Sequence, residues 1–335
     1  MKSYKLLIGL MTILTGIISA AAQPETVTFG ELWRLEGVKT GIWDNTGDRI
    51  AVAGASGGLH LYDTRSGKLL QSLTETEIED YPTLSQVAWS PNNRFLAARL
   101  NLSDKIWVWD TISGQHIYTL LWRDSPLAFT PDGSFLTGMS GSGQIQVWDS
   151  VSGSLEQTLR EKRLDYQSVR FFSWSPNGKL ILFGQTEGAS LSVFDFPTKT
   201  VRFRTHLTDG KVRQGGWTPD GNVIYAVSQS FTLYRWTAAD AVPLKPFFVG
   251  GGMVSFSPDG RYFAANYQSF PYDDNPPPWN VVYIYDAQTL ERVGQIDHPE
   301  VDDYINWLAW SPDGERIATV TTNGNTLRVW QRVTP

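Results

Sequence analysis

The sequence predicts an all-β fold, a seven-bladed β-propeller built of four-stranded antiparallel blades. Three observations predict it. One aromatic turn motif recurs at intervals of 39 to 54 residues, an alternating strand that ends in an aromatic residue follows most copies, and the chain of 335 residues contains 14 tryptophans. Intervals close to about 40 to 45 residues are typical of one propeller blade per repeat. A repeated aromatic position also accounts for the excess of tryptophan.

The N-terminal segment stands apart from these repeats. Two lysines precede an apolar run over residues 6–21, and three alanines, residues 20–22, come directly before Gln23. Basic residues, an apolar run and a small-residue cleavage site are the three parts of a secretory signal peptide, and the run is shorter than the roughly 20 residues of a spanning helix. We expect a signal peptide over residues 1–22 and one domain over 23–335, secreted or periplasmic, with no membrane span once the signal is removed.

Composition narrows the classes of function. The chain has no cysteine, which excludes disulfides and thiolate chemistry, and 41% hydrophobic residues, enough for a large core. The net charge of −6 becomes about −8 without the signal, which holds two lysines and no acid. Binding to nucleic acid depends on neutralising phosphates, so an acidic chain disfavours it.

The turn motif is an aromatic residue followed by Ser or Thr, Pro, Asp or Asn, and Gly. In such a turn Pro sets φ at the first corner, Asp or Asn hydrogen-bonds to the nearby backbone, and Gly accepts a positive φ. Each copy therefore predicts a strand reversal. A degenerate first copy and six others occur: Trp43-Asp44-Asn45-Thr46-Gly47, Trp89-Ser90-Pro91-Asn92-Asn93, Phe129-Thr130-Pro131-Asp132-Gly133, Trp174-Ser175-Pro176-Asn177-Gly178, Trp217-Thr218-Pro219-Asp220-Gly221, Phe256-Ser257-Pro258-Asp259-Gly260 and Trp310-Ser311-Pro312-Asp313-Gly314.

A second recurring feature lies about 15 to 20 residues after most turns. The alternation of apolar and polar residues marks a strand, and a second reversal such as Asp110-Thr111-Ile112-Ser113-Gly114 often follows it. The strands are Ile106-Trp107-Val108-Trp109-Asp110, Ile145-Gln146-Val147-Trp148-Asp149, Leu191-Ser192-Val193-Phe194-Asp195, Val282-Tyr283-Ile284-Tyr285-Asp286 and Leu327-Arg328-Val329-Trp330-Gln331.

The Trp-Asp pairs and the Ser-Pro-Asp-Gly turns resemble those of the WD-repeat family over almost the whole mature chain. The family's Gly-His dipeptide is missing, although His298 stands near its place in the last repeat. Asp104 is the counterpart of the family's buried Asp. The resemblance implies that the connections between blades, and those between second and third strands, share one face, while the Pro-Asp-Gly turns lie on the other.

Ring closure follows from counting strands. The last repeat reaches its third strand at Trp330 and has no outer strand of its own, whereas the strand-like segment Thr28 to Leu35 precedes the first repeat. If this segment pairs with the last blade, no long sheet edge is left open. We therefore expect the N-terminal strand to complete the seventh blade.

The chain shows no catalytic constellation. His60 is expected in a third strand, His116 in an outer strand, and His206 and His298 in connections between blades, without metal-ligand spacing. No phosphate loop or dinucleotide motif occurs, and the run Asp44 to Asp48 is better explained as a reversal than as a calcium loop. The sequence predicts no enzyme, no metal and no cofactor.

Three long connections predict a binding face. They run from Thr74 to Pro82, from Gln268 to Asn280 and from Asp297 to Tyr304, and three prolines stiffen the second. A stiff loop loses little entropy on binding, aromatic residues serve as anchors, and acids favour a basic partner or a cation. Equally, such loops can be plain solvated surface. The candidate residues are Glu79, Asp80, Tyr81, Phe270, Tyr272, Asp273, Asp274, Trp279, Asp302, Asp303 and Tyr304.

The function that fits best is an exported, non-catalytic platform that binds a protein or peptide, and we expect it to be a monomer. Two alternatives stay open. One is a propeller that helps to assemble complexes of the periplasmic envelope. The other is a lactonase-like or hydrolase-like propeller enzyme that uses carboxylates or a metal at the central channel, and a divalent ion held by inward-pointing acids would favour it.

Overall fold

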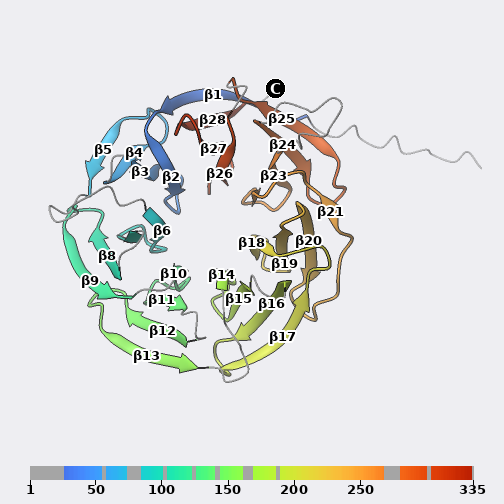
Figure 1. Cartoon of the computed structure of the whole chain (residues 1–335). Helices are drawn as coiled ribbons and strands as arrows, with labels where there is room; N and C mark the ends of the chain where they lie inside the picture. The colour runs from blue at the N-terminus through green and yellow to red at the C-terminus, as the bar shows by residue number, and fades with distance from the viewer. Residues whose placement is uncertain are drawn as a thin grey trace, which may run out of the picture.

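A computed structural model describes residues 26–54, 58–73, 84–100, 104–122, 126–139, 144–160, 169–185, 189–267, 280–299 and 303–333. These residues form seven four-stranded antiparallel sheets, set around a central axis as the blades of a propeller (Figure 1). The predicted all-β, seven-bladed fold is therefore confirmed. No described segment forms an α-helix.

Strands β1 to β28 follow the predicted order within each blade. Blade 1 holds β2 (Val38–Trp43), β3 (Arg49–Gly54), β4 (Leu59–Asp63) and β5 (Leu69–Ser72); blade 2 holds β6 (Leu84–Trp89), β7 (Phe95–Leu100), β8 (Lys105–Asp110) and β9 (His116–Leu121); blade 3 holds β10 (Leu127–Phe129), β11 (Phe135–Met139), β12 (Gln144–Asp149) and β13 (Leu155–Arg160); blade 4 holds β14 (Val169–Trp174), β15 (Leu180–Gln185), β16 (Ser190–Asp195) and β17 (Thr200–His206). Blade 5 holds β18 (Val212–Trp217), β19 (Val223–Ser228), β20 (Thr232–Thr237) and β21 (Phe247–Phe248); blade 6 holds β22 (Val254–Phe256), β23 (Tyr262–Tyr267), β24 (Val281–Asp286) and β25 (Arg292–Asp297); blade 7 holds β26 (Ile305–Trp310), β27 (Arg316–Thr321), β28 (Leu327–Val333) and β1 (Thr28–Leu35).

The Pro-Asp-Gly motif forms the turn between the first and second strands of each blade. The glycine at its end has a φ between 68° and 80°, and Asn93 takes the same left-handed conformation with a φ of 58°. The hydroxyl of Ser175 shows the polar half of the motif, because it donates to Asn177 Oδ1 at 2.8 Å and accepts the amide of Leu180 at 2.9 Å. The motif thus closes the hairpin with its own side chains.

The Asp of each Trp-Asp ending caps the next reversal. The carboxylate of Asp149 accepts the amides of Val151 and Ser152 at 3.1 and 2.8 Å, and that of Asp195 accepts the amide of Thr198 at 2.9 Å. Such contacts are those of an Asx turn. The predicted second reversal is confirmed, and it leads into the outer strand of the blade.

The hydrophobic core is divided among the seams, the interfaces between neighbouring blades. The described residues form seven clusters of buried side chains, and each cluster joins residues of two adjacent blades. The aromatic residue of every turn motif belongs to the cluster that its blade shares with the preceding blade; Trp43, for example, packs with Val320 and Val329 of blade 7. The repeated aromatic position therefore fastens each blade to the one before it.

The N-terminal strand closes the ring as expected. Strand β1 pairs antiparallel with β28, from Thr28 opposite Val333 to Leu35 opposite Leu327, and forms the outer edge of blade 7 (Figure 1). Two other expectations were wrong. His206 ends the outer strand β17 instead of lying in a connection, and Asp104 is exposed instead of buried.

Candidate functional site

The ring has two faces that differ in the connections they carry. Because the four strands of a blade alternate in direction, the turns from first to second and from third to fourth strand share one face, which we call the turn face. The connections from second to third strand and from blade to blade share the opposite face, which we call the loop face. Of the predicted binding residues, Asp303 and Tyr304 are described, and they lie on the loop face.

Most of the predicted binding residues lie outside the described residues. These are Glu79, Asp80, Tyr81, Phe270, Tyr272, Asp273, Asp274, Trp279 and Asp302. The described residues of the set, Asp303 and Tyr304, come directly before the innermost strand β26. Tyr304 is 39% exposed, and its carbonyl accepts the amide of Thr322 at 2.8 Å.

Asp303 is engaged within the chain. Its side chain is buried, and its carboxylate accepts the amides of Tyr304, Asn323 and Gly324 at 2.8, 2.6 and 2.8 Å. Burial opposes ionisation here, but these amide bonds outweigh it and lower the pKa of Asp303. The carboxylate holds the connection between β27 and β28 against the loop before β26.

A basic cavity opens on the loop face where two innermost strands begin. It has a volume of about 330 Å³ and lies between the start of β14 and the start of β18, which are neighbours near the centre of the ring (Figure 1). Its walls include Arg170, Lys211, Arg213 and Gln229, and all four side chains are exposed. Within the described ranges no carboxylate pairs with any of the three cations.

The backbone beneath this cavity is strained. Phe231, in the turn between β19 and β20, has a φ of 61°, which is unusual for a bulky residue. Its ring is buried, and the guanidinium of Arg213 lies 4.7 Å from the ring centroid. Arg170 donates to the carbonyl of Arg213 at 3.4 Å. An aromatic ring and a backbone carbonyl thus hold the two arginines side by side.

The turn face carries a different polar arrangement, a guanidinium clamp across the seam between blades 7 and 1. Arg316, the first residue of β27, is buried and donates to Thr64 Oγ1 at 2.6 Å, to the carbonyl of Gly47 at 3.1 Å and to the carboxylate of Asp313. Its guanidinium lies 5.7 Å from the centroid of the Trp43 ring. One side chain of blade 7 therefore donates hydrogen bonds to two turns of blade 1.

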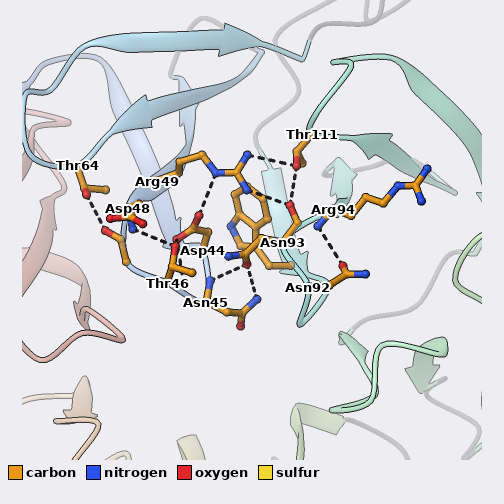
Figure 2. A network of polar contacts seen from close by, with 12 residues as sticks. Asp44, Asn45, Thr46, Asp48, Arg49, Thr64, Asn92, Asn93, Arg94 and Thr111 are labelled. Carbon is orange, nitrogen blue, oxygen red and sulfur yellow. Dashed lines mark hydrogen bonds and ion pairs between the residues drawn. The ribbon is translucent and has the colours of Figure 1, made fainter.

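The seam between blades 1 and 2 repeats this clamp (Figure 2). Arg49, the first residue of β3, donates to Asp44 Oδ2 at 2.9 Å, to the carbonyl of Asn93 at 2.9 Å and to Thr111 Oγ1 at 3.4 Å. It lies 4.9 Å from the centroid of the Trp89 ring. The receptor for each arginine is thus an aromatic ring, a carboxylate, a hydroxyl and a turn carbonyl.

His298 has structural surroundings. His298 is buried, its Nε2 lies 3.1 Å from Thr319 Oγ1, and Trp330 donates its indole N–H to the same oxygen at 3.0 Å. His298 thus shares a hydrogen-bonded cluster with Thr319 and Trp330. Burial, with a contribution from Arg328, lowers the pKa of His298 to about 3. Because this neutral imidazole is buried, it cannot contact a substrate.

The shifted carboxylates also follow from turn geometry. The hydrogen bond from the Ser152 amide lowers the pKa of Asp149, and the amide of Thr198 does the same for Asp195. Perturbed pKa values can indicate active sites, but in these turns the hydrogen bonds of the hairpins explain them. The described residues include no cluster of metal-binding side chains and no helix long and apolar enough to cross a membrane.

The comparison with known families identifies the repeats. Residues 127–149 and 291–331 match the family described as WD domain, G-beta repeat. The first stretch spans β10 to β12, and the second spans β25 to β28. The chain therefore carries WD40 repeats on a seven-bladed propeller, as the turn motifs and Trp-Asp endings predict.

Several curated proteins are similar over part of their length. Actin-interacting protein 1 of Drosophila melanogaster is 24% identical over 60% of this chain and 32% of its own length. Meiotic fizzy-related protein 2 of Schizosaccharomyces pombe is 29% identical over 50% of this chain and 34% of its own. The chain thus spans about a third of the length of these relatives.

Solved structures establish the same fold. The β-propeller domain of Cps50 (Swd1) from Myceliophteria thermophila superimposes with a TM-score of 0.70 at 16% identity, covering 92% of this chain and 100% of that domain. A chain of the mitotic checkpoint complex gives 0.71 at 19% identity, covering 96% and 99%.

Proposed function

We propose that this protein is a non-catalytic interaction platform that works outside the cytoplasm and binds a protein or peptide on its loop face. The observation that carries the proposal is the basic cavity of Arg170, Lys211 and Arg213. Three exposed cations lie together there without a carboxylate partner among the described residues, in a chain whose net charge is −6. An acidic segment of a partner would complement them.

Two further arguments support a platform. Propellers with WD repeats generally bind proteins, and this chain has such repeats. The titratable groups with shifted pKa values at the turns and around His298 are engaged in hydrogen bonds that hold the fold, so they are not poised for catalysis. The predicted acidic and aromatic loops of blades 1, 6 and 7 remain part of the proposal as a second, oppositely charged region of the same face.

The test is partner capture with matched variants. The protein without residues 1–22 would be immobilised and exposed to the extracytoplasmic fraction of its host, beside the double variants Arg170→Ala with Arg213→Ala and Tyr272→Ala with Trp279→Ala. Arg65→Ala with Lys68→Ala removes two exposed cations from the turn face and serves as the control. Thermal unfolding checks that every variant is folded.

We expect a partner that the control retains and that at least one loop-face variant loses. A partner that binds all four proteins equally would show that the loop face is not the binding site. Loss in the control as well would indicate unspecific charge attraction. Binding of a divalent ion or small molecule with turnover, in place of any protein, would favour the propeller-enzyme alternative.

The extracytoplasmic location has its own test. If residues 1–22 are a signal peptide, the mature protein purified from its host begins at Gln23. Intact-mass and N-terminal sequencing measure this directly. A mature chain that still contains the lysines at positions 2 and 5 contradicts the proposed cleavage.

A further inference from the structure

A cavity on the turn face lies at the seam between blades 3 and 4. Its volume is about 340 Å³. Blade 3 contributes the turn after β10 and the start of β11, and blade 4 contributes the turn after β14 and the residue after β16. The walls are formed by Thr130, Pro131, Asp132, Phe135, Trp174, Pro176, Asn177, Gly178 and Phe196.

Apart from the carboxylate, these residues occupy the same positions in the repeat as the members of both guanidinium clamps. Asp132 matches Asp313 of the Arg316 clamp, whereas Asp44 of the Arg49 clamp stands two residues earlier in its motif. Phe135 is the first residue of its second strand, as Arg316 and Arg49 are in theirs. Phe196 follows the Asp that ends its third strand, in the place of Thr64. The seam between blades 3 and 4 therefore lacks both the arginine and the hydroxyl of a clamp.

The ring, the carboxylate and the carbonyl of the arginine receptor are retained, and Phe196 packs edge-on against the ring with 4.8 Å between the ring centroids. Trp174 stands where Trp43 lies beneath Arg316, and its indole N–H is fixed by Thr137 Oγ1 at 3.0 Å. Asp132 stands where Asp313 pairs with Arg316, and Gly178 stands where the carbonyl of Gly47 accepts from that arginine.

The carboxylate of Asp132 is oriented by the same partners as that of Asp313. Asp132 Oδ1 accepts the Thr130 hydroxyl at 2.5 Å and the Ser134 amide at 3.0 Å. Asp313 Oδ1 likewise accepts the Ser311 hydroxyl at 2.5 Å and the amide of the second residue after it at 3.0 Å. In Asp313 the other oxygen, Oδ2, receives the guanidinium. The described residues supply no cation to Asp132 in an ion pair.

Two other seams fill this position with side chains of their own. Between blades 6 and 7, Tyr262 stacks on Trp310 with 6.3 Å between ring centroids and 9° between planes. Between blades 5 and 6 there is a cavity of about 390 Å³, but Arg235 lines it and donates to the carbonyl of Ala287 at 3.1 Å. Asp220 at that seam already binds the amide group of Asn222.

We propose that the seam between blades 3 and 4 is a binding site for an arginine side chain of an extended partner segment. The two clamps of this chain show how such a side chain binds. Its planar guanidinium lies over the Trp174 ring and donates to the carboxylate of Asp132 and the carbonyl of Gly178. A guanidinium suits a ring and a carboxylate together better than an ammonium does, because it stacks and donates in a fork. This site lies on the turn face and does not depend on the loop-face proposal.

The test uses a fluorescein-labelled peptide, Gly-Gly-Arg-Gly-Gly, and fluorescence polarisation with the protein lacking residues 1–22. Two matched peptides carry citrulline or lysine in place of arginine. The decisive protein variant is Asp132→Asn, which removes the charge. Asparagine keeps the turn, because Asn92 and Asn177 form the same two hydrogen bonds in blades 2 and 4. Asp259→Asn changes the same motif position in blade 6, where Asp259 Oδ1 makes the same two hydrogen bonds, and is the matched control.

We expect the arginine peptide to bind, the citrulline peptide to bind about tenfold more weakly, and Asp132→Asn to weaken binding of the arginine peptide by about tenfold. The lysine peptide should bind more weakly than the arginine peptide, and Asp259→Asn should leave the affinity for the arginine peptide unchanged. Equal binding of citrulline, an unchanged affinity of Asp132→Asn, an equal loss in Asp259→Asn, or no binding of the arginine peptide at millimolar concentration each overturns the proposal.

A second variant rebuilds the clamp from within. Phe135→Arg with Phe196→Thr supplies the arginine and the hydroxyl that blades 1 and 7 use. We expect this double variant to lose the arginine peptide while it stays folded, as its melting temperature would show. Retained binding in a folded double variant contradicts the proposed site. If the double variant does not fold, the comparison of Asp132→Asn with Asp259→Asn still decides the matter.

Discussion

Arg316 is the residue whose removal should harm the fold most directly. Its guanidinium is buried and serves Asp313, Thr64 and the carbonyl of Gly47 at once. Arg316→Ala leaves Oδ2 of Asp313 and the hydroxyl oxygen of Thr64 without the donor that they share, so we expect the free energy of unfolding to fall by about 3 kcal/mol. Urea denaturation measures this loss.

Two other arginines provide comparisons for the predicted loss of stability. The side chain of Arg49 is 24% exposed in a similar clamp, and Arg49→Ala should lower the free energy of unfolding by about 1 kcal/mol. The side chain of Arg65 is 75% exposed beside Asp48, and Arg65→Ala should change it by less than about 0.5 kcal/mol. If Arg316→Ala costs no more than Arg65→Ala, the clamp does not stabilise the seam.

His298 predicts how stability depends on pH. Its folded pKa is about 3, whereas the unfolded chain binds a proton near the ordinary value of 6.5. Below that value the unfolded state takes up more protons, so stability is lost as the pH falls from 6.5 toward 3, by about 2 kcal/mol at pH 5. His298→Gln should remove this slope, as urea denaturation at pH 7 and pH 5 would show.

The turn carboxylates affect a lower range of pH. Hydrogen bonds from Ser152 and Thr198 lower the pKa values of Asp149 and Asp195 from 3.8, so their stabilisation is complete above about pH 4 and is lost as the pH falls through the lowered values. A slope between pH 6.5 and 5 that survives in His298→Gln would therefore mean that another group is responsible.

Among the strands, β1 is the one whose removal should affect the closure of the ring most. It covers the edge of β28, and Trp33 within it donates to the carbonyl of Thr64 in blade 1 at 2.7 Å. Removing residues 26–35 leaves the edge of β28 unpaired, and an unpaired strand edge can pair with other chains. We expect the truncated protein to melt at a lower temperature and to aggregate.

Size-exclusion chromatography with light scattering and thermal unfolding test this expectation. Leu32→Ala is the matched control, because Leu32 is 41% exposed and lies at the irregularity of the β1 register between Glu31 and Trp33. The control should remain monodisperse and melt within a few degrees of the parent protein. A truncated protein that behaves as the control does would show that closure by β1 is dispensable.

The elements themselves could be predicted from sequence because their signals are local. The hydrogen bonds of a turn motif such as Trp174 to Gly178 join residues no more than five positions apart in the sequence. The number of copies of the motif gives the number of blades. The seam chemistry could not be predicted in this way. Arg316 and Thr64 are 252 residues apart, and no short motif links them.

The candidate site shows the same limit. In the sequence, Asp303 lies in an acidic loop and is interpreted as a binding residue. Its carboxylate instead accepts amides about 20 residues further along the chain, which only the folded blade brings near. The basic cavity was missed because Arg170, Lys211 and Arg213 come from the starts of strands in two blades. Cations directly beside the first residue of successive inner strands are the signal that could have indicated it.

At the scale of the whole molecule, closure makes every blade an inner blade. Each of the seven core clusters joins two neighbours, and the strand pairing of β1 with β28 leaves no terminal blade that could fray alone. An open array of repeats unfolds from its ends, because a terminal repeat has one neighbour. A closed ring has to lose two seams to release one blade.

This difference predicts a single cooperative unfolding transition. Tryptophan fluorescence reports the seams, where residues such as Trp43 and Trp174 are buried, and far-ultraviolet circular dichroism reports the strands within blades. The two should follow the same curve in urea, with one midpoint, because blades cannot lose their seams and keep their sheets. The truncation of residues 26–35 should separate the two curves, since it opens the ring at blade 7. Separate curves in the intact protein would mean that blades unfold individually despite the closed ring, and then the clamps at blade 1 would stabilise only their own seams.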